Sequence, residues 1–161
     1  MLYSRTQHNG NLARIVNGSD MTGAAWTIQG ISSRAPTRLT DDNSNGAHRI
    51  YAVTTGTVLG RYTVMTVAVG GGSTNKHARI DLGNAHVVVN TSDGSLSYVA
   101  GCSVTPSVLL NGQWCVNLQC VLSGDRVLKI YMAPDTTGAV SYQGNSSGIL
   151  EVTGLWLAQW R

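Results

Sequence analysis

The last third of the chain, residues 113–161, limits the possible folds more than any other segment. Two apolar strand candidates, at 113–118 and 126–131, precede a turn-rich stretch at 142–148 and a long, mostly apolar closing segment at 149–160. A long apolar strand is stable only where other sheet surface covers it. The segment therefore predicts an all-β protein, a two-sheet antiparallel β-sandwich.

Composition supports this fold class. The 161 residues suit one domain that buries roughly 70% of its unfolded surface. The 19 glycines and the low charged fraction of 12% are typical of many short strands joined by tight turns. The net charge of +3 is spread along the chain, and no apolar run of about 18 residues occurs. We therefore expect no nucleic acid partner, no membrane insertion and no signal peptide.

Turn signals divide the chain into short strands about 8 to 12 residues apart. Asn111-Gly112 between two apolar runs is the strongest hairpin signal, because both residues tolerate positive φ. The polar residues 1–20 predict an N-terminal arm or edge strand, and residues 21–161 the sandwich, with a jelly-roll topology. Further strand candidates are residues 24–31, 47–53, 61–69, 77–82, 85–90, 95–99 and 104–110.

Several short motifs follow one another in an order typical of one protein family. They are Ala24-Ala25-Trp26-Thr27, Gly60-Arg61-Tyr62-Thr63-Val64, Leu110 to Val116, Tyr142 to Ile149 and Leu155 to Gln159. In this order they resemble a jelly-roll module of tailed-phage virion proteins, which is similar in fold to carbohydrate-binding modules. The sequence departs from the family pattern at Gln113, Cys115 and Leu155.

The resemblance implies a virion protein made in the host cytoplasm. Such modules lie on tail fibres, tailspikes, baseplates or capsid surfaces. We expect a small stand-alone component, such as a capsid decoration or tail accessory protein, with other virion proteins as partners. The resemblance also implies a homo-oligomer, with a trimer favoured, and adhesion to a host surface polysaccharide.

Candidate ligand sites follow from the carboxylates and aromatic residues. Related modules often hold a structural calcium, so the resemblance points to Glu151 with Asp20 or Asp42 as oxygen ligands. An outward-facing, solvated Glu151 is the alternative. No cofactor is expected.

Sugars stack on aromatic rings, and the candidate glycan-binding residues are Arg49, Tyr51, Tyr98, Tyr142 and Gln143.

The four tryptophans are predicted mainly as core residues. Trp156 and Trp160 lie four apart and would share an inward strand face with Leu150 and Val152.

The three cysteines are an odd number, and Cys115 and Cys120 are five apart, which places them on opposite strand faces. We expect free thiols.

Catalysis has weak support. The one adjacent carboxylate pair, Asp41-Asp42, lies in a polar segment where a solvated turn is the ordinary explanation. Together with the resemblance, which implies a virion surface protein, this favours a non-enzymatic function. The alternative is a stand-alone glycan-binding module or a tail-fibre receptor-binding domain, and a small hydrolase is a third hypothesis without a motif.

Overall fold

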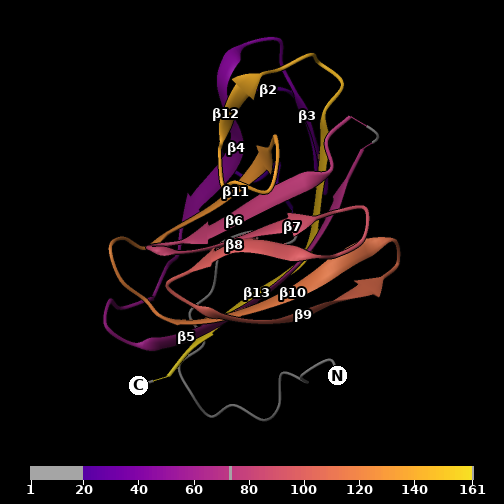
Figure 1. Ribbon diagram of the computed structural model, residues 1–161. Coiled ribbons are helices and arrows are strands. Elements are labelled where there is room, and N and C mark those ends of the chain that lie inside the picture. The colour runs from indigo at the N-terminus through magenta and orange to yellow at the C-terminus, as the bar shows by residue number, and fades with distance from the viewer. Residues whose placement is uncertain (1–19, 73, 161) are drawn as a thin grey trace.

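The computed structural model describes residues 20–72 and 74–160, and these residues form thirteen strands and no helix. The strands make two antiparallel sheets that pack against each other, which confirms the predicted β-sandwich (Figure 1). In that view β6, β7 and β8 lie side by side above β13, β10 and β9. The described residues include no helix long and apolar enough to cross a membrane.

The first sheet is built from strands that are far apart in the sequence. Its order is β1 (Thr27–Gln29), β4 (Asn45–Val53), β11 (Val127–Ala133), β6 (His77–Leu82), β7 (Ala85–Asn90) and β8 (Leu96–Ala100), with β12 (Ser141–Gln143) paired to β4. The second sheet has the order β2 (Ile31–Ala35), β3 (Arg38–Asp41), β13 (Ile149–Gln159), β5 (Tyr62–Gly71), β10 (Gln113–Val121) and β9 (Ser103–Leu110). The edge strands β8 and β9 follow each other in the chain.

The core lies between the inward faces of the two sheets. In the first sheet Ile130 pairs with Ile50 on one side and Ile80 on the other, and all three are fully buried. In the second sheet Met65 and Leu118 are register partners with almost no exposed surface. Alternation of apolar and polar residues along these strands places one apolar face of each sheet against the other.

The hairpin predicted at Asn111-Gly112 is confirmed, and a second one joins β7 to β8. Asn111 and Gly112 join β9 to β10 with φ values of 50° and 77°, the conformation that a tight hairpin turn requires. The segment Thr91 to Gly94 leads from β7 into β8, which pair antiparallel. The residues of the turns themselves therefore determine where these strands reverse direction.

The predicted strand at 24–31 is wrong in one respect, because the chain changes sheets within it. Trp26 is buried ahead of β1, which belongs to the first sheet, and β2 after Gly30 belongs to the second. Gly30 has φ +65°, and a Cβ there would lie 2.5 Å from the carbonyl oxygen of Ala47. Only glycine fits this crossing.

A bulge in β13 changes which side chains of the closing strand face inward. Thr153 pairs with Ala68 and Trp156 with Thr66, so β13 uses one residue more than β5 around Gly154, at φ +59°. Leu150 and Val152 are buried before the bulge, and Leu157 after it. The prediction that Trp156 and Trp160 share the inward face is therefore wrong: Trp156 is half-buried outside the core cluster, and Trp160 is 37% exposed.

The edge strand β9 also contains a bulge. Val108 pairs with Cys115 and Thr105 with Asn117, which leaves an extra residue on β9 next to Pro106. Proline cannot donate a ladder hydrogen bond, and it is tolerated here because the strand lies at the sheet edge.

The three cysteines are free. Cys120 is buried in the core, and Cys115, on the opposite face of β10, is half-buried, as predicted. Burial raises the pKa of Cys102 and Cys115, and it raises the pKa of Cys120 to about 11. All three are therefore neutral thiols at pH 7.

The predicted N-terminal arm covers residues 1–20; residues 1–19 lie outside the described residues, and the arm stays a prediction. Residue 21 already belongs to the sandwich: Met21 is buried in the core, and its backbone N–H donates to the carbonyl oxygen of Pro36 at 2.7 Å.

Candidate functional site

The outer face of the first sheet carries alternating tyrosine rings and guanidinium groups. Tyr51 and Arg49 come from β4, Tyr131 from β11, Arg79 from β6 and Tyr98 from β8. We call these five residues the tyrosine–arginine row. They share this face because Tyr131 is the register partner of both Arg49 and Arg79, and the residues between them along the strands point into the core.

Distances within the row are those of cation–π contacts. The Cζ atom of Arg49 lies 4.7 Å from the ring centroid of Tyr51 and 5.4 Å from that of Tyr131. The Cζ atom of Arg79 lies 5.9 Å from the Tyr131 centroid and 5.2 Å from the Tyr98 centroid. Each guanidinium thus lies between two rings, within the range of about 6 Å at which the attraction is significant.

Tyr98 ends the row and is its most exposed ring, at 46%. It stacks on His86 of β7, with 4.8 Å between centroids and an interplanar angle of 19°. Its backbone has φ 48°, an uncommon value for a residue other than glycine. A Cβ at Gly138 would lie 2.2 Å from the Tyr98 ring, so the segment after β11 passes directly against it.

Hydrogen bonds hold both arginines in place. Arg79 donates to both carboxylate oxygens of Asp81, at 2.6 and 3.0 Å, and to the carbonyl oxygen of Gly138. Burial alone would lower the pKa of Arg79, but the hydrogen bonds and charge of Asp81 outweigh it and raise the pKa. Arg49 donates to Gln29 Oε1 and to the hydroxyl oxygen of Tyr131, both at 2.9 Å. The row is therefore fixed before any ligand arrives.

Three of the five predicted glycan-binding residues, Arg49, Tyr51 and Tyr98, belong to this row. The other two, Tyr142 and Gln143, lie apart from it on β12, where Tyr142 pairs with Gly46 near the start of β4. Sequence reasoning missed Tyr131 and Arg79. The alternation in 126–131 could have indicated that Tyr131 faces away from the core, but no local signal places Arg79 beside it.

Tyr142 and Gln143 instead line a polar cleft of about 230 Å³ with Asp41, Thr74, Asn75, Pro134, Asn145 and Gly148. The Tyr142 ring packs 4.3 Å from that of the fully buried His48, and its hydroxyl donates to Asp41 Oδ2 at 3.4 Å. Burial, followed by the charge of Asp41, raises the pKa of Tyr142 above its usual range. These contacts make Tyr142 a structural residue of the cleft.

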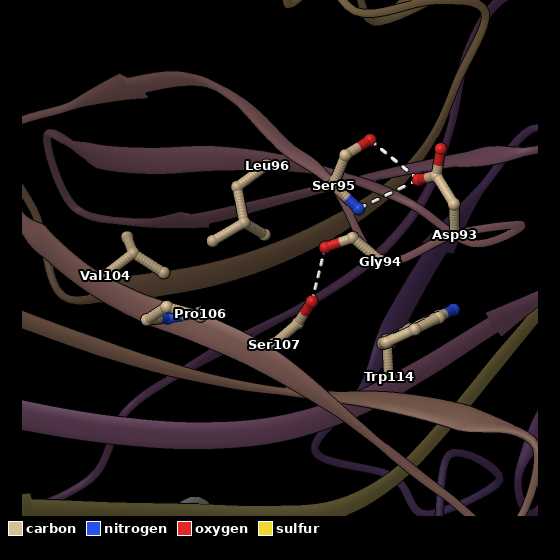
Figure 2. A pocket seen from close by; sticks show the side chains of 8 residues that line it. All are labelled: Asp93, Gly94, Ser95, Leu96, Val104, Pro106, Ser107 and Trp114. Carbon is tan, nitrogen blue, oxygen red and sulfur yellow. Dashed lines mark hydrogen bonds between the residues drawn. The ribbon is translucent and has the colours of Figure 1, made fainter.

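A larger open groove of about 530 Å³ lies between the edge strands β8 and β9 (Figure 2). In Figure 2 Leu96, Val104 and Pro106 lie on one side of it and Trp114 on the other. Its polar groups already bind one another or the backbone: Ser107 donates to the carbonyl oxygen of Gly94, and Asp93 accepts two hydrogen bonds from Ser95. The groove offers apolar surface with little unsatisfied polar chemistry.

Each predicted calcium ligand accepts hydrogen bonds from protein groups in this structure. Asp20 accepts hydrogen bonds from Thr22, Asp42 accepts them from Ser44, and Glu151 accepts one from Gln113 at 3.5 Å. Among residues 20–72 and 74–160, no three His, Cys, Asp or Glu side chains lie close enough to hold a metal ion. Calcium binding by Glu151 with Asp20 or Asp42 stays a prediction.

The pair Asp41-Asp42 is divided between core and surface. Asp41 is 1% exposed, and Asp42 is partly exposed in its own turn. Asp41 is therefore not the solvated turn residue that the sequence suggested. Its oxygens accept hydrogen bonds from the backbone N–H groups of Asn145 and Gly148, so Asp41 stabilises the segment that precedes β13.

Comparison with known proteins adds no relative. No protein-family model matches the chain, and no curated protein sequence matches it.

Proposed function

We propose that this protein is a non-enzymatic binding protein that recognises carbohydrate through the outer face of its first sheet. One observation carries the proposal: the accessible rings of Tyr51 and Tyr98 lie 4.7 and 5.2 Å from the guanidiniums of Arg49 and Arg79, while the ring of Tyr131, only 5% exposed, lies between the two arginines and supports the row. Sugar rings stack on aromatic faces, and their hydroxyls bind guanidinium and carboxylate groups. A rigid row that contains both aromatic rings and guanidinium groups therefore suits the binding of a saccharide chain.

The proposal contains no chemical step. Burial raises the pKa of each thiol, which makes it a weak nucleophile at neutral pH. The buried carboxylate of Asp41 is occupied by the N–H groups around it. These features support binding as the activity.

We place this binding protein on the surface of a phage particle, in line with the resemblance of its motifs to jelly-roll modules of virion proteins. Host surface polysaccharide is then the proposed ligand. A capsid or tail accessory protein with this property would hold the particle near its host.

The test is a glycan array followed by calorimetry, with variants in which alanine replaces single tyrosines. Tyr51→Ala and Tyr98→Ala are each expected to weaken binding about tenfold, because truncating a tyrosine that packs against a ligand costs about 1–2 kcal/mol. Tyr62→Ala is the matched control: Tyr62 is 45% exposed, close to the 46% of Tyr98, but lies on the second sheet. Equal weakening by all three variants, or no glycan binding at all, would reject the proposal.

Assembly on the particle is a second candidate function, favoured by an exposed apolar segment. Val108, Leu109 and Leu110 at the end of the edge strand β9 are 58%, 54% and 44% exposed. Adjacent apolar side chains at a sheet edge are typical of contact surfaces. We propose that they contact a second copy of the chain or another virion protein.

Sedimentation of the purified protein tests this second function. The expected result is an oligomer, with a trimer favoured, that dissociates when Leu109 is replaced by aspartate. A wild-type protein that stays monomeric at high concentration and does not sediment with particles would contradict it.

A further inference from the structure

The two arginines of the tyrosine–arginine row differ in charge compensation. Arg79 is neutralised by Asp81, which accepts two of its N–H groups at 2.6 and 3.0 Å. Within residues 20–72 and 74–160, Arg49 donates to neutral acceptors, Gln29 Oε1 and the Tyr131 hydroxyl. Among the residues that the structure describes, no carboxylate lies within ion-pair distance of Arg49. One guanidinium in the row thus keeps its charge available.

The surroundings of Arg49 add positive charge. Its neighbour Tyr51 is the register partner of Lys129, so the strand beside Tyr51 contributes a second cationic residue. Lys129 pairs with Asp125 at 3.5 Å, but this contact is solvent-exposed and therefore weak. The end of the row at Tyr51 is accordingly more positive than the end at Tyr98, where Asp81 balances Arg79.

The position of the Arg49 guanidinium, as well as its charge, favours the binding of an anion. Its Nε and Nη1 atoms are fixed by neutral partners, and the guanidinium lies beside the half-buried Tyr51 ring. A planar guanidinium binds carboxylate and other oxyanions with good geometry, and hydrogen bonds to charged groups contribute about 1.5–3 kcal/mol each. A sugar that stacks on Tyr51 would bring a substituent of its ring to Arg49.

We propose that the preferred ligand is an acidic saccharide whose oxyanion pairs with Arg49 while its sugar ring stacks on Tyr51. This inference rests on the proposed carbohydrate-binding function and names the ligand class of the same site. The oxyanion is a carboxylate of a uronic or sialic acid residue, or a phosphate on the sugar. Arg79, already neutralised by Asp81, fixes the geometry of the row and takes no anion.

The experiment compares acidic polysaccharides with neutral forms of the same chains. Polygalacturonate, hyaluronate, polysialate and a phosphorylated mannan are tested by calorimetry, with the carboxyl-reduced or dephosphorylated form of each. The expected result is that at least one acidic polymer binds about tenfold or more tightly than its neutral form, and that added salt weakens this binding. Dextran sulfate measures attraction by charge alone.

Variants assign the preference to Arg49. Arg49→Gln is expected to remove the preference for the acidic form, so that the acidic and neutral forms of one polymer bind with equal affinity. Arg49→Lys should keep part of it. Arg38→Gln is the control, because Arg38 is an exposed arginine on β3 of the second sheet. Thermal unfolding of each variant shows whether it folds, and the wild-type comparison of polymers needs no variant.

The outcomes separate the two proposals. Equal binding of acidic and neutral forms, or equal loss with Arg38→Gln and Arg49→Gln, would overturn the acidic ligand and leave carbohydrate binding intact. Binding of dextran sulfate as tight as that of every acidic polymer would also overturn it. If no polymer and no array glycan binds, the proposed function itself is wrong.

Discussion

Replacing Asp41 with alanine is expected to lower the free energy of unfolding by about 3 kcal/mol. The Asp41 side chain is 1% exposed and stabilises the segment that leads into β13. Its Oδ1 atom accepts the buried Gly148 N–H at 2.8 Å, and its Oδ2 atom accepts the Asn145 N–H and the Tyr142 hydroxyl at 3.4 Å. Alanine would leave these donors without a partner inside the protein.

Urea denaturation of the Asp41→Ala and Asp42→Ala variants measures this effect. Asp42 is the matched control, because it is the adjacent carboxylate and is 36% exposed: among the described residues it accepts hydrogen bonds from Ser44 in its own turn, and its one longer contact is with His48 Nδ1 at 3.7 Å. Its replacement should change the midpoint far less. Faster amide hydrogen exchange at 142–148 in Asp41→Ala should accompany the loss of stability. Similar midpoints for the two variants would contradict the structural role of Asp41.

Replacing Ile130 with alanine is expected to lower the free energy of unfolding by about 2 to 5 kcal/mol. Ile130 is fully buried at the centre of the first sheet, between Ile50 and Ile80. Its side chain points toward the second sheet, so alanine would leave a cavity between two rigid layers that cannot close fully. The size of the effect therefore reports how tightly the two sheets pack.

Two further variants test this interpretation. Ile130→Val removes one methyl group and should cost about 0.5 to 1.5 kcal/mol. Val53→Ala, in the neighbouring strand β4, removes apolar surface from a side chain that is 56% exposed, and it should change stability by no more than about 0.5 kcal/mol. An equal loss in Ile130→Ala and Val53→Ala would mean that the inward and outward faces are assigned wrongly.

Much of the fold could be predicted from the sequence because its signals are local. Alternation in residues 61–69 places Met65 and Val67 inward, and the structure buries both in β5. Asn111-Gly112 predicts a hairpin because both residues must adopt positive φ. Such features depend on neighbouring residues alone, and they need no knowledge of the sheet order.

The wrong predictions arise where one residue changes the chain direction or the register. The chain passes from one sheet to the other at Gly30, which composition does not distinguish from other glycines. The bulge at Gly154 adds one residue to β13, so a strict period of two no longer applies beyond it. For that reason Trp156 and Trp160, which lie beyond the bulge, do not face the core as predicted.

The candidate site was predictable in part for the same reason. Arg49, Tyr51 and Tyr98 could be chosen by residue type, and alternation places the first two on one face. These three residues belong to one row only because β11 and β6 lie between β4 and β8, and long-range strand pairing determines that order. Tyr131 and Arg79 become neighbours only through that order, since they are distant in sequence.

The bulge at Pro106 bears on how the molecule avoids uncontrolled aggregation. An edge strand with unpaired backbone groups can recruit a strand from another molecule and so begin a fibril. Proline has no N–H to offer, and the extra residue of the bulge breaks the repeat that an incoming strand would follow. The edge of β9 is thus divided into two short pieces, neither of which is a long regular template for fibril growth.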